Sequence, residues 1–263
     1  MAPTEQLFTD GAAYERLMGR WSRRAGDVFL EWLEAPQGLH WLDVGCGTGV
    51  FTEQVIRHNT PAAIIGIDPS AEQLAYARDR AGLGTAEFRV GDAQELPFPD
   101  ESFDVAVMAL VIHFVPNPAK AIAEMARVLH RGGRAAAYVW DYPRAGTPTA
   151  PMSAAMKAMG LEPPAPPSAQ ATSSAALEEF WRKAGFVEIG TRTIKILVEF
   201  TDFDEFWGSL SVPVGTLGKA IAQMTPDSLK RLRRTLQERT ATAADGRVVY
   251  EAHANAIKGM KPA

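Results

Sequence analysis

The feature that most constrains this chain is an apolar stretch that ends in three alternating glycines, Trp41-Leu42-Asp43-Val44-Gly45-Cys46-Gly47-Thr48-Gly49. Residues 39–44 have the composition of a buried strand, and a helical pattern begins at about residue 51. Glycines in such a turn can adopt positive φ and let a ligand lie against the backbone. The first N–H groups of the helix remain available to that ligand. The sequence therefore predicts a nucleotide-binding strand–turn–helix unit.

Five strand-like segments alternate with helical patterns in the first half of the chain. The strands are expected at residues 39–44, 63–68, 86–90, 103–108 and 134–140. The helices between them are expected at residues 51–58, 69–81 and 118–129. The connections are too long for hairpins and suit crossover helices, which predicts an α/β fold with a Rossmann-like, doubly wound sheet.

The flanking segments divide the chain into four parts. Residues 1–36 carry helical patterns that either pack on the sheet or form a lid over the ligand, and residues 37–142 form the core. Residues 143–176 are rich in proline and are expected to form a substrate loop. Residues 177–263 complete the sheet, with strands expected at 186–200 and 247–259 and a helical cap inserted at about 203–240.

Composition argues against several classes of protein. The net charge of −4 disfavours a nucleic-acid partner, and the basic helix expected at residues 230–239 is more typical of a solvated surface. The single cysteine excludes a disulfide framework within the chain and a cysteine-rich zinc site, and we expect no metal. No signal peptide and no apolar stretch long enough to span a bilayer is apparent, so we expect a cytoplasmic monomer or homodimer.

Carboxylates stand in or at the ends of the expected strands: Asp43, Asp68, Asp92 and Asp104. Asp68 is placed to accept hydrogen bonds from ribose hydroxyls. Asp92 can accept a hydrogen bond from an exocyclic amino group such as that of adenine. Asp43, beside the turn, disfavours a pyrophosphate and suits a cationic group. A phosphate-free ligand with adenine, ribose and a positive centre is predicted, which describes S-adenosylmethionine.

Two other functions remain open on the residues alone. An NAD-dependent oxidoreductase would carry G-x-G-x-x-G, but the third glycine position is Val50. A non-catalytic module that binds a cofactor and activates a partner would expose a large uncharged patch on residues 203–240, with no pocket beneath it.

Five stretches resemble the motifs of class I S-adenosylmethionine-dependent methyltransferases, in particular the ubiquinone/menaquinone-biosynthesis-type (methyltransferase type 11) subgroup. They are Leu42–Gly49, Ile67–Ser70, Gly91–Phe98, Phe103–Val105 and Arg127–Leu129 with Gly132-Gly133. The resemblance covers residues 40–140 closely and 177–194 loosely. It implies a seven-stranded sheet in the order 3-2-1-4-5-7-6 with strand seven antiparallel, and methyl transfer from S-adenosylmethionine. Our hypothesis is that the acceptor is a small, apolar or aromatic molecule beneath the 143–176 loop and the 203–240 cap.

The resemblance also implies a set of cofactor-binding residues: Tyr14, Arg20, Asp43, Gly45, Cys46, Gly47, Asp68, Pro69, Gln73, Asp92, Ala93, Gln94 and Ala109. In that set, Asp68 binds the ribose and Asp92 the adenine amino group, while Asp43 lies near the methionine end. Gln73 lies over adenine, and Tyr14 and Arg20 close over the cofactor from the N-terminal helices.

The acceptor side is less well defined by the sequence. Many members of the subgroup have two adjacent histidines after strand four, and here they read His113-Phe114. His113 is the candidate general base, although a structural histidine beside the pocket fits equally well. The predicted substrate pocket contains Trp21, His113, Trp140, Tyr142 and Met156.

Overall fold

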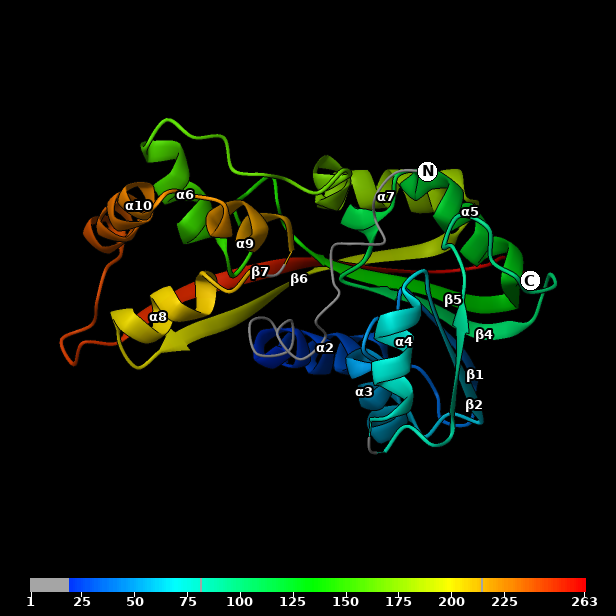
Figure 1. The fold of residues 1–263 in the computed structure, drawn as a ribbon. Helices are drawn as coiled ribbons and strands as arrows, with labels where there is room; N and C mark the ends of the chain where they lie inside the picture. The colour runs from blue at the N-terminus through cyan, green and yellow to red at the C-terminus, as the bar shows by residue number, and fades with distance from the viewer. Residues whose placement is uncertain (1–18, 81, 214) are drawn as a thin grey trace.

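The computed structural model describes residues 19–80, 82–213 and 215–263 of the chain. Seven strands form one sheet in the order β3-β2-β1-β4-β5-β7-β6 (Figure 1). The strands are β1 (His40–Val44), β2 (Ala63–Asp68), β3 (Ala86–Val90), β4 (Phe103–Ala109), β5 (Leu129–Trp140), β6 (Val187–Phe200) and β7 (Val248–Met260). Strands β1 to β5 pair in parallel, whereas β7 pairs antiparallel with both β5 and β6. The predicted fold class and strand order are confirmed.

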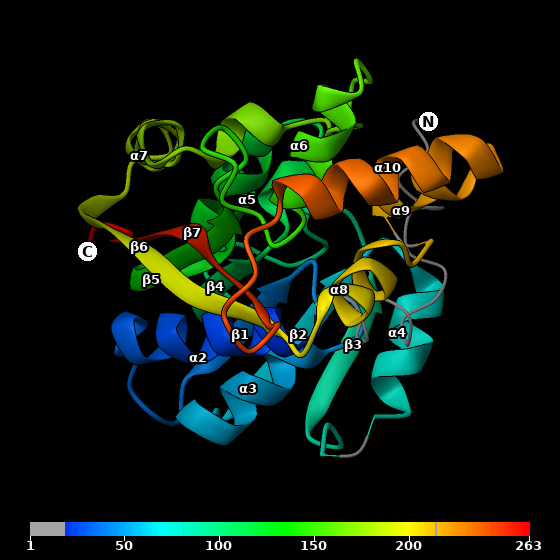
Figure 2. The same ribbon diagram turned by 90° about the vertical axis from the view of Figure 1, so that its left-hand side faces the viewer.

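Helices cover both faces of this sheet because the central strands are buried on both sides. On one face α2 (Arg20–Leu33) and α3 (Val50–Asn59) pack through Phe29, Phe51 and Val55. On the other face lie α5 (Pro118–Val128) and α7 (Ser174–Lys183), which pack through residues such as Met125 and Trp181. Figures 1 and 2 show these two pairs on opposite sides of the sheet. The shorter α4 (Ala71–Arg78) packs beside β2 and β3.

Strands β6 and β7, of 14 and 13 residues, project beyond the rest of the sheet. Strand β7 pairs with β5 only from Ala254, opposite Trp140, onward. Among the strands of the sheet, residues 248–253 pair with β6 alone, ending at the pair Phe200–Val248. Because Trp140 is the carboxyl end of β5, the hairpin extends past the edge at which parallel strands bind ligands.

Four helices surround the projecting hairpin and form the cap, which we define as α6 with residues 201–247. They are α6 (Ala150–Ala158), α8 (Phe203–Leu210), α9 (Gly215–Ala222) and α10 (Pro226–Arg239). In Figures 1 and 2, α10 lies beside α6, and the two helices are in contact. The buried side chains of the cap, Met152, Phe206 and Leu232 among them, join the apolar cluster that runs beneath α2. The cap and this face of the sheet therefore share one core.

One boundary differs from the sequence-based expectation. Strand β5 begins at Leu129 and includes Gly132-Gly133, whereas a helix was expected to run to residue 129 and the strand to begin at residue 134. The pairing of β4 with β5 shifts register between Phe103 and Val105, so the glycines lie in an irregular part of the strand.

Among residues 19–80, 82–213 and 215–263, no helix has both the length and the apolar character needed to cross a membrane.

Candidate functional site

A cavity of about 430 Å³ lies at the carboxyl ends of β1 to β4, beneath the start of α2. Its lining comes from the glycine turn, the ends of β2 and β3, the segment after β4, and α2. The lining residues are Gly19, Ser22, Gly45–Thr48, Val50, Phe51, Gln54, Ile67–Ser70, Gln73, Gly91–Gln94, Ala109–Val111, Phe114–Pro116 and Tyr138. This is the edge at which ligands bind in open α/β sheets.

The glycine turn forms a tight backbone cradle on one side of the cavity. Gly45 and Gly47 have φ of +76° and +52°, which side chains disfavour. A Cβ atom on Gly45 would lie 2.6 Å from the side chain of Val111, and one on Gly47 would lie 2.7 Å from Oε1 of Gln73. Both glycines are therefore required by the backbone conformation and by the space above them.

Asp68 links the glycine turn to the end of β2. Its Oδ2 accepts a hydrogen bond from the Gly47 N–H at 3.0 Å, and its Oδ1 accepts one from the Ser70 N–H at 2.9 Å. Burial raises the pKa of this carboxyl, and the two backbone N–H groups oppose that shift. The carboxylate is thus held in one orientation and keeps further lone pairs for a ligand.

Asp92 is oriented by the loop that follows β3. The Gln94 side-chain amide lies 3.2 Å from both carboxylate oxygens, and the Gln94 backbone N–H donates to Oδ1 at 2.8 Å. Oε1 of Gln94 in turn accepts a hydrogen bond from the Asn117 N–H at the start of α5. A second carboxylate therefore lines the cavity next to Asp68, on the neighbouring strand.

Asp43 lies behind the glycine turn instead of in the cavity lining. Its Oδ2 accepts a 2.6 Å hydrogen bond from the Thr52 hydroxyl of α3. Burial raises its pKa to about 7, with a smaller contribution from the charge of Asp68. Oδ1 is buried and has no hydrogen-bond partner among the described residues. The predicted direct contact between Asp43 and the cofactor is not supported by this position.

Most of the predicted cofactor residues do line the cavity. They are Gly45, Cys46, Gly47, Asp68, Pro69, Gln73, Asp92, Ala93, Gln94 and Ala109. Arg20 does not line it: its guanidinium stacks over Trp21 and Phe200 and forms a 3.4 Å ion pair with Glu205 of α8. Gly19 and Ser22 line the cavity, whereas Arg20 points toward the cap. Its side chain therefore joins α2 to the cap. Tyr14 lies outside the described residues.

His113 is buried and lies outside the cavity lining. Its ring packs against Phe114 and Tyr142, with ring centroids 3.9 and 5.1 Å apart. Burial lowers its pKa to about 3, so the imidazole is neutral over the physiological pH range. The structure therefore does not place this candidate general base in the cavity lining.

The other predicted pocket residues belong to the core for a shared reason. Trp21, Trp140 and Met156 are almost completely buried in the cluster that joins the sheet to the cap, and Tyr142 packs against it. Their large apolar side chains were expected to form a pocket wall, but they fill the space between layers instead. Sequence reasoning missed the residues that do line this side, Phe51, Leu110, Val111, Phe114, Val115, Pro116 and Tyr138. Phe114 carried a signal, because it replaces the second histidine.

Comparison with known proteins agrees with the geometry. The methyltransferase domain family matches residues 42–137. A 2-methyl-6-phytyl-1,4-hydroquinone methyltransferase of Oryza sativa subsp. japonica is 37% identical over 116 residues, which cover 44% of this chain and 35% of the relative. A ubiquinone/menaquinone biosynthesis C-methyltransferase of Geobacter sulfurreducens is 34% identical over 130 residues, covering 48% of this chain and 49% of the relative. The chain thus matches about half or less of each relative.

Solved structures extend the likeness in fold to nearly the whole chain. The phosphoethanolamine N-methyltransferase 2 of Haemonchus contortus, solved with phosphomonomethylethanolamine and S-adenosylhomocysteine, superposes with a TM-score of 0.58. It is 19% identical, and the match covers 96% of this chain and 57% of that protein. At this identity the likeness concerns the fold alone.

Proposed function

We propose that this chain, whose residues 42–137 form a class I S-adenosylmethionine-dependent methyltransferase domain, transfers a methyl group to a small apolar or aromatic molecule. S-adenosylmethionine is the cofactor that defines this class. The observation that carries the proposal is a single cavity in which a glycine cradle and two carboxylates stand on one side and apolar side chains stand on the other.

The glycine and carboxylate side of the cavity fits the cofactor. Gly45 and Gly47 line the cavity without side chains, so a ligand can lie against the backbone of the turn there. The fixed carboxylates of Asp68 and Asp92 offer acceptors for ribose hydroxyls and for the adenine amino group. Burial raises the pKa of Asp43 behind the cradle to about 7; a cationic ligand in the cavity would favour its ionised form, whereas a pyrophosphate would oppose it.

The cofactor supplies an activated methyl group on a sulfonium, and the leaving group is neutral. The protein is therefore required to align the acceptor and to exclude water, not to stabilise a developing anion. Phe51, Val111 and Phe114 provide apolar walls for that purpose. Asp68 and Asp92 are the carboxyl groups of the described lining, and we assign both to the cofactor.

The apolar walls favour an acceptor that is itself apolar or aromatic. A charged acceptor would lose its hydration there without gaining a partner from these walls. The two curated relatives act on a hydroquinone and in quinone biosynthesis, which supports an aromatic acceptor.

The test has a binding step and a turnover step. Titration calorimetry with S-adenosylhomocysteine is expected to give one site per chain, and NADH at the same concentration is expected to give no heat. Absence of S-adenosylhomocysteine binding at millimolar concentration would overturn the proposal. Turnover is then followed as S-adenosylhomocysteine release with menadiol, palmitate and phosphoethanolamine. We expect menadiol to be the best acceptor, and a preference for phosphoethanolamine would contradict the assignment of an apolar acceptor.

A further inference from the structure

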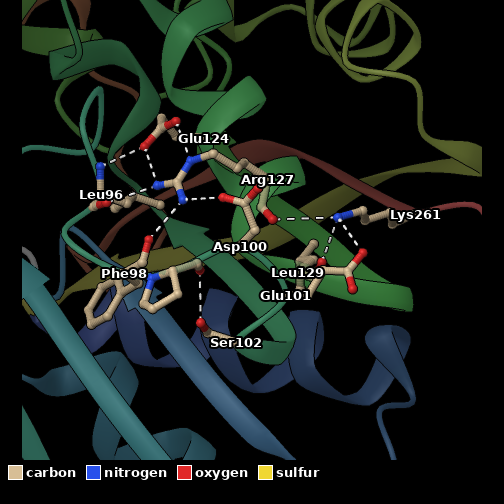
Figure 3. Close-up of polar contacts among 10 residues, drawn as sticks. Leu96, Phe98, Asp100, Glu101, Ser102, Glu124, Arg127, Leu129 and Lys261 are labelled. Atoms are coloured by element: carbon tan, nitrogen blue, oxygen red, sulfur yellow. Dashed lines mark hydrogen bonds and ion pairs between the residues drawn. The ribbon is translucent and has the colours of Figure 1, made fainter.

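The loop between β3 and β4 serves the cavity at one end and is fastened to α5 at the other. Its first residues, 91–94, line the cavity and include Asp92. Its later part, residues 96–100, lies against the last turns of α5, with Leu96 and Phe98 buried in the core on that face. Figure 3 shows this second part converging on one side chain, Arg127 of α5.

Arg127 uses its N–H groups to hold both this loop and Glu124 of its own helix. Nη2 donates to the Leu96 carbonyl at 2.9 Å, and Nη1 donates to the Phe98 carbonyl and the Asp100 carboxylate, both at 2.8 Å. Nε and Nη2 also donate to the two carboxylate oxygens of Glu124 at 2.8 and 2.7 Å. A planar guanidinium with five donors suits this arrangement, and an ammonium group cannot reproduce it.

Glu124 completes the attachment from the same helix. Its Oε2 accepts the Leu96 N–H at 2.8 Å, so Leu96 is held through both its N–H and its carbonyl. The hydrogen bonds from Arg127 lower the pKa of Glu124, which keeps the carboxylate ionised. The ion pair between Glu124 and Arg127 is partly exposed to solvent, so its Coulomb energy is small. Its main effect is to fix the positions of the groups that hold the loop.

A second attachment lies one helix length away, at the start of α5. The Asn117 N–H donates to Oε1 of Gln94, and the amide of Gln94 holds the carboxylate of Asp92. The loop is therefore fixed to the two ends of one rigid helix, through Gln94 at the cavity and through Leu96–Asp100 at Arg127. Residues 94–96 connect the two attachments, and Leu96 belongs to the distal one through both its N–H and its carbonyl.

We propose that Arg127 is a positioning residue for the adenine end of the cofactor, acting through the β3–β4 loop on Asp92. This inference rests on the proposed function, because it assumes that Asp92 accepts a hydrogen bond from the adenine amino group. It goes beyond that function by assigning cofactor selectivity to a side chain that lies outside the cavity lining.

Lys261 provides a matched control at the same end of α5. Its Nζ donates to the carbonyls of Leu129 and Arg127 at 2.8 and 3.4 Å, and it lies 3.7 Å from Glu101 (Figure 3). These contacts fasten β7 to the end of α5 and include none of residues 91–100. If this region served only to stabilise the fold, Lys261→Met would disturb that role just as a change at Arg127 would.

The experiment compares two ligands that differ at the adenine amino group, S-adenosylhomocysteine and S-inosylhomocysteine. Wild-type protein is expected to prefer the adenosine compound by about tenfold or more, because the inosine oxygen faces a carboxylate. Arg127→Lys is expected to reduce this preference about tenfold, mainly by weakening binding of the adenosine compound. Lys261→Met is expected to lower the melting temperature but to leave the preference unchanged.

The outcomes separate this inference from the proposed function. If wild-type protein binds neither ligand, the proposed function fails. If wild-type protein discriminates between the ligands and Arg127→Lys discriminates equally well, the positioning role is wrong. Should Arg127→Lys not fold, Glu124→Gln takes its place, because it weakens the same attachment while leaving Arg127 its loop carbonyls. We expect that variant to lose about half of the preference on a logarithmic scale.

Discussion

The two sides of the cavity are built in different ways. The side formed by the glycine turn and by the ends of β2 and β3 presents backbone and carboxylates, and each carboxylate accepts hydrogen bonds from nearby backbone N–H groups. The side formed by Phe51, Tyr138 and the segment after β4 presents apolar side chains selected by packing. The first side depends on local backbone conformation, whereas the second depends on which side chains the neighbouring layers leave facing inward. The contrast predicts separable effects on cofactor and acceptor.

Asp68→Ala gives the largest expected effect. It removes the ribose acceptor and leaves the Gly47 and Ser70 N–H groups without their partner, so S-adenosylhomocysteine should bind at least about 100-fold more weakly. Titration calorimetry measures this loss. Asp68→Asn, which keeps the shape and one acceptor oxygen, should lose less. Unchanged affinity of Asp68→Ala for S-adenosylhomocysteine would contradict the assignment of the carboxylate side of the cavity to the cofactor.

The second prediction concerns the buried groups behind each side, Asp43 and His113. The folded pKa of Asp43, about 7, lies above its unfolded value, so its ionisation reduces stability as the pH rises from about 4 to 7. The folded pKa of His113, about 3, lies below its unfolded value, so its contribution is complete above about pH 6.5 and is lost as the pH falls. The two slopes oppose each other between about pH 4 and 6.5.

Urea unfolding of Asp43→Asn and His113→Gln separates the two contributions. Relative to wild type, Asp43→Asn should gain stability as the pH rises through this window, by about 2 kcal/mol over two pH units. His113→Gln should show the opposite trend, gaining stability relative to wild type as the pH falls. A difference from wild type that does not vary with pH in either variant would show that the group is not held in the folded state as described.

The third prediction compares an apolar residue of the cavity with one of the cap core. Phe114→Ala should raise KM for the best acceptor about tenfold, while leaving S-adenosylhomocysteine affinity within about twofold. Met156→Ala should instead lower the free energy of unfolding by about 2–5 kcal/mol, because it opens a cavity in the core, and should leave KM for the acceptor unchanged. If Met156→Ala instead raised KM for the acceptor and Phe114→Ala lowered only the free energy of unfolding, Met156 would belong to the acceptor pocket.

Arg20→Ala should have the smallest effect. The ion pair with Glu205 is solvent-exposed, so the loss of stability should stay below about 1 kcal/mol. S-adenosylhomocysteine affinity should remain within about twofold of wild type, since Arg20 faces the cap. A tenfold loss of affinity in the calorimeter would place the guanidinium over the cofactor after all.

The sequence predicted those parts of the molecule that are determined locally. The glycines with positive φ and the end of β2 at Asp68 follow from short-range rules, and the structure has them where they were expected. The strand order was expected from the resemblance to a family, and it is confirmed. The orientation of a large side chain is decided by contacts distant in sequence. Trp140 lies on a strand whose carboxyl end points toward the cavity, but its ring enters the core beneath α2. Asp43 likewise lies at the correct strand end, but its side chain turns toward Thr52.

The projecting β6–β7 hairpin makes the cap exchangeable. Since Phe200 and Val248 are direct partners, the segment 201–247 leaves the sheet and returns to it at one point. The entropy of closing such an insertion grows slowly with its length, so segments of different size can be grafted between these two residues without altering strand register. Such a graft leaves the glycine turn and its carboxylates in place. One segment of the cap can therefore be replaced while the cavity lining, to which no described residue of 201–247 belongs, keeps its composition.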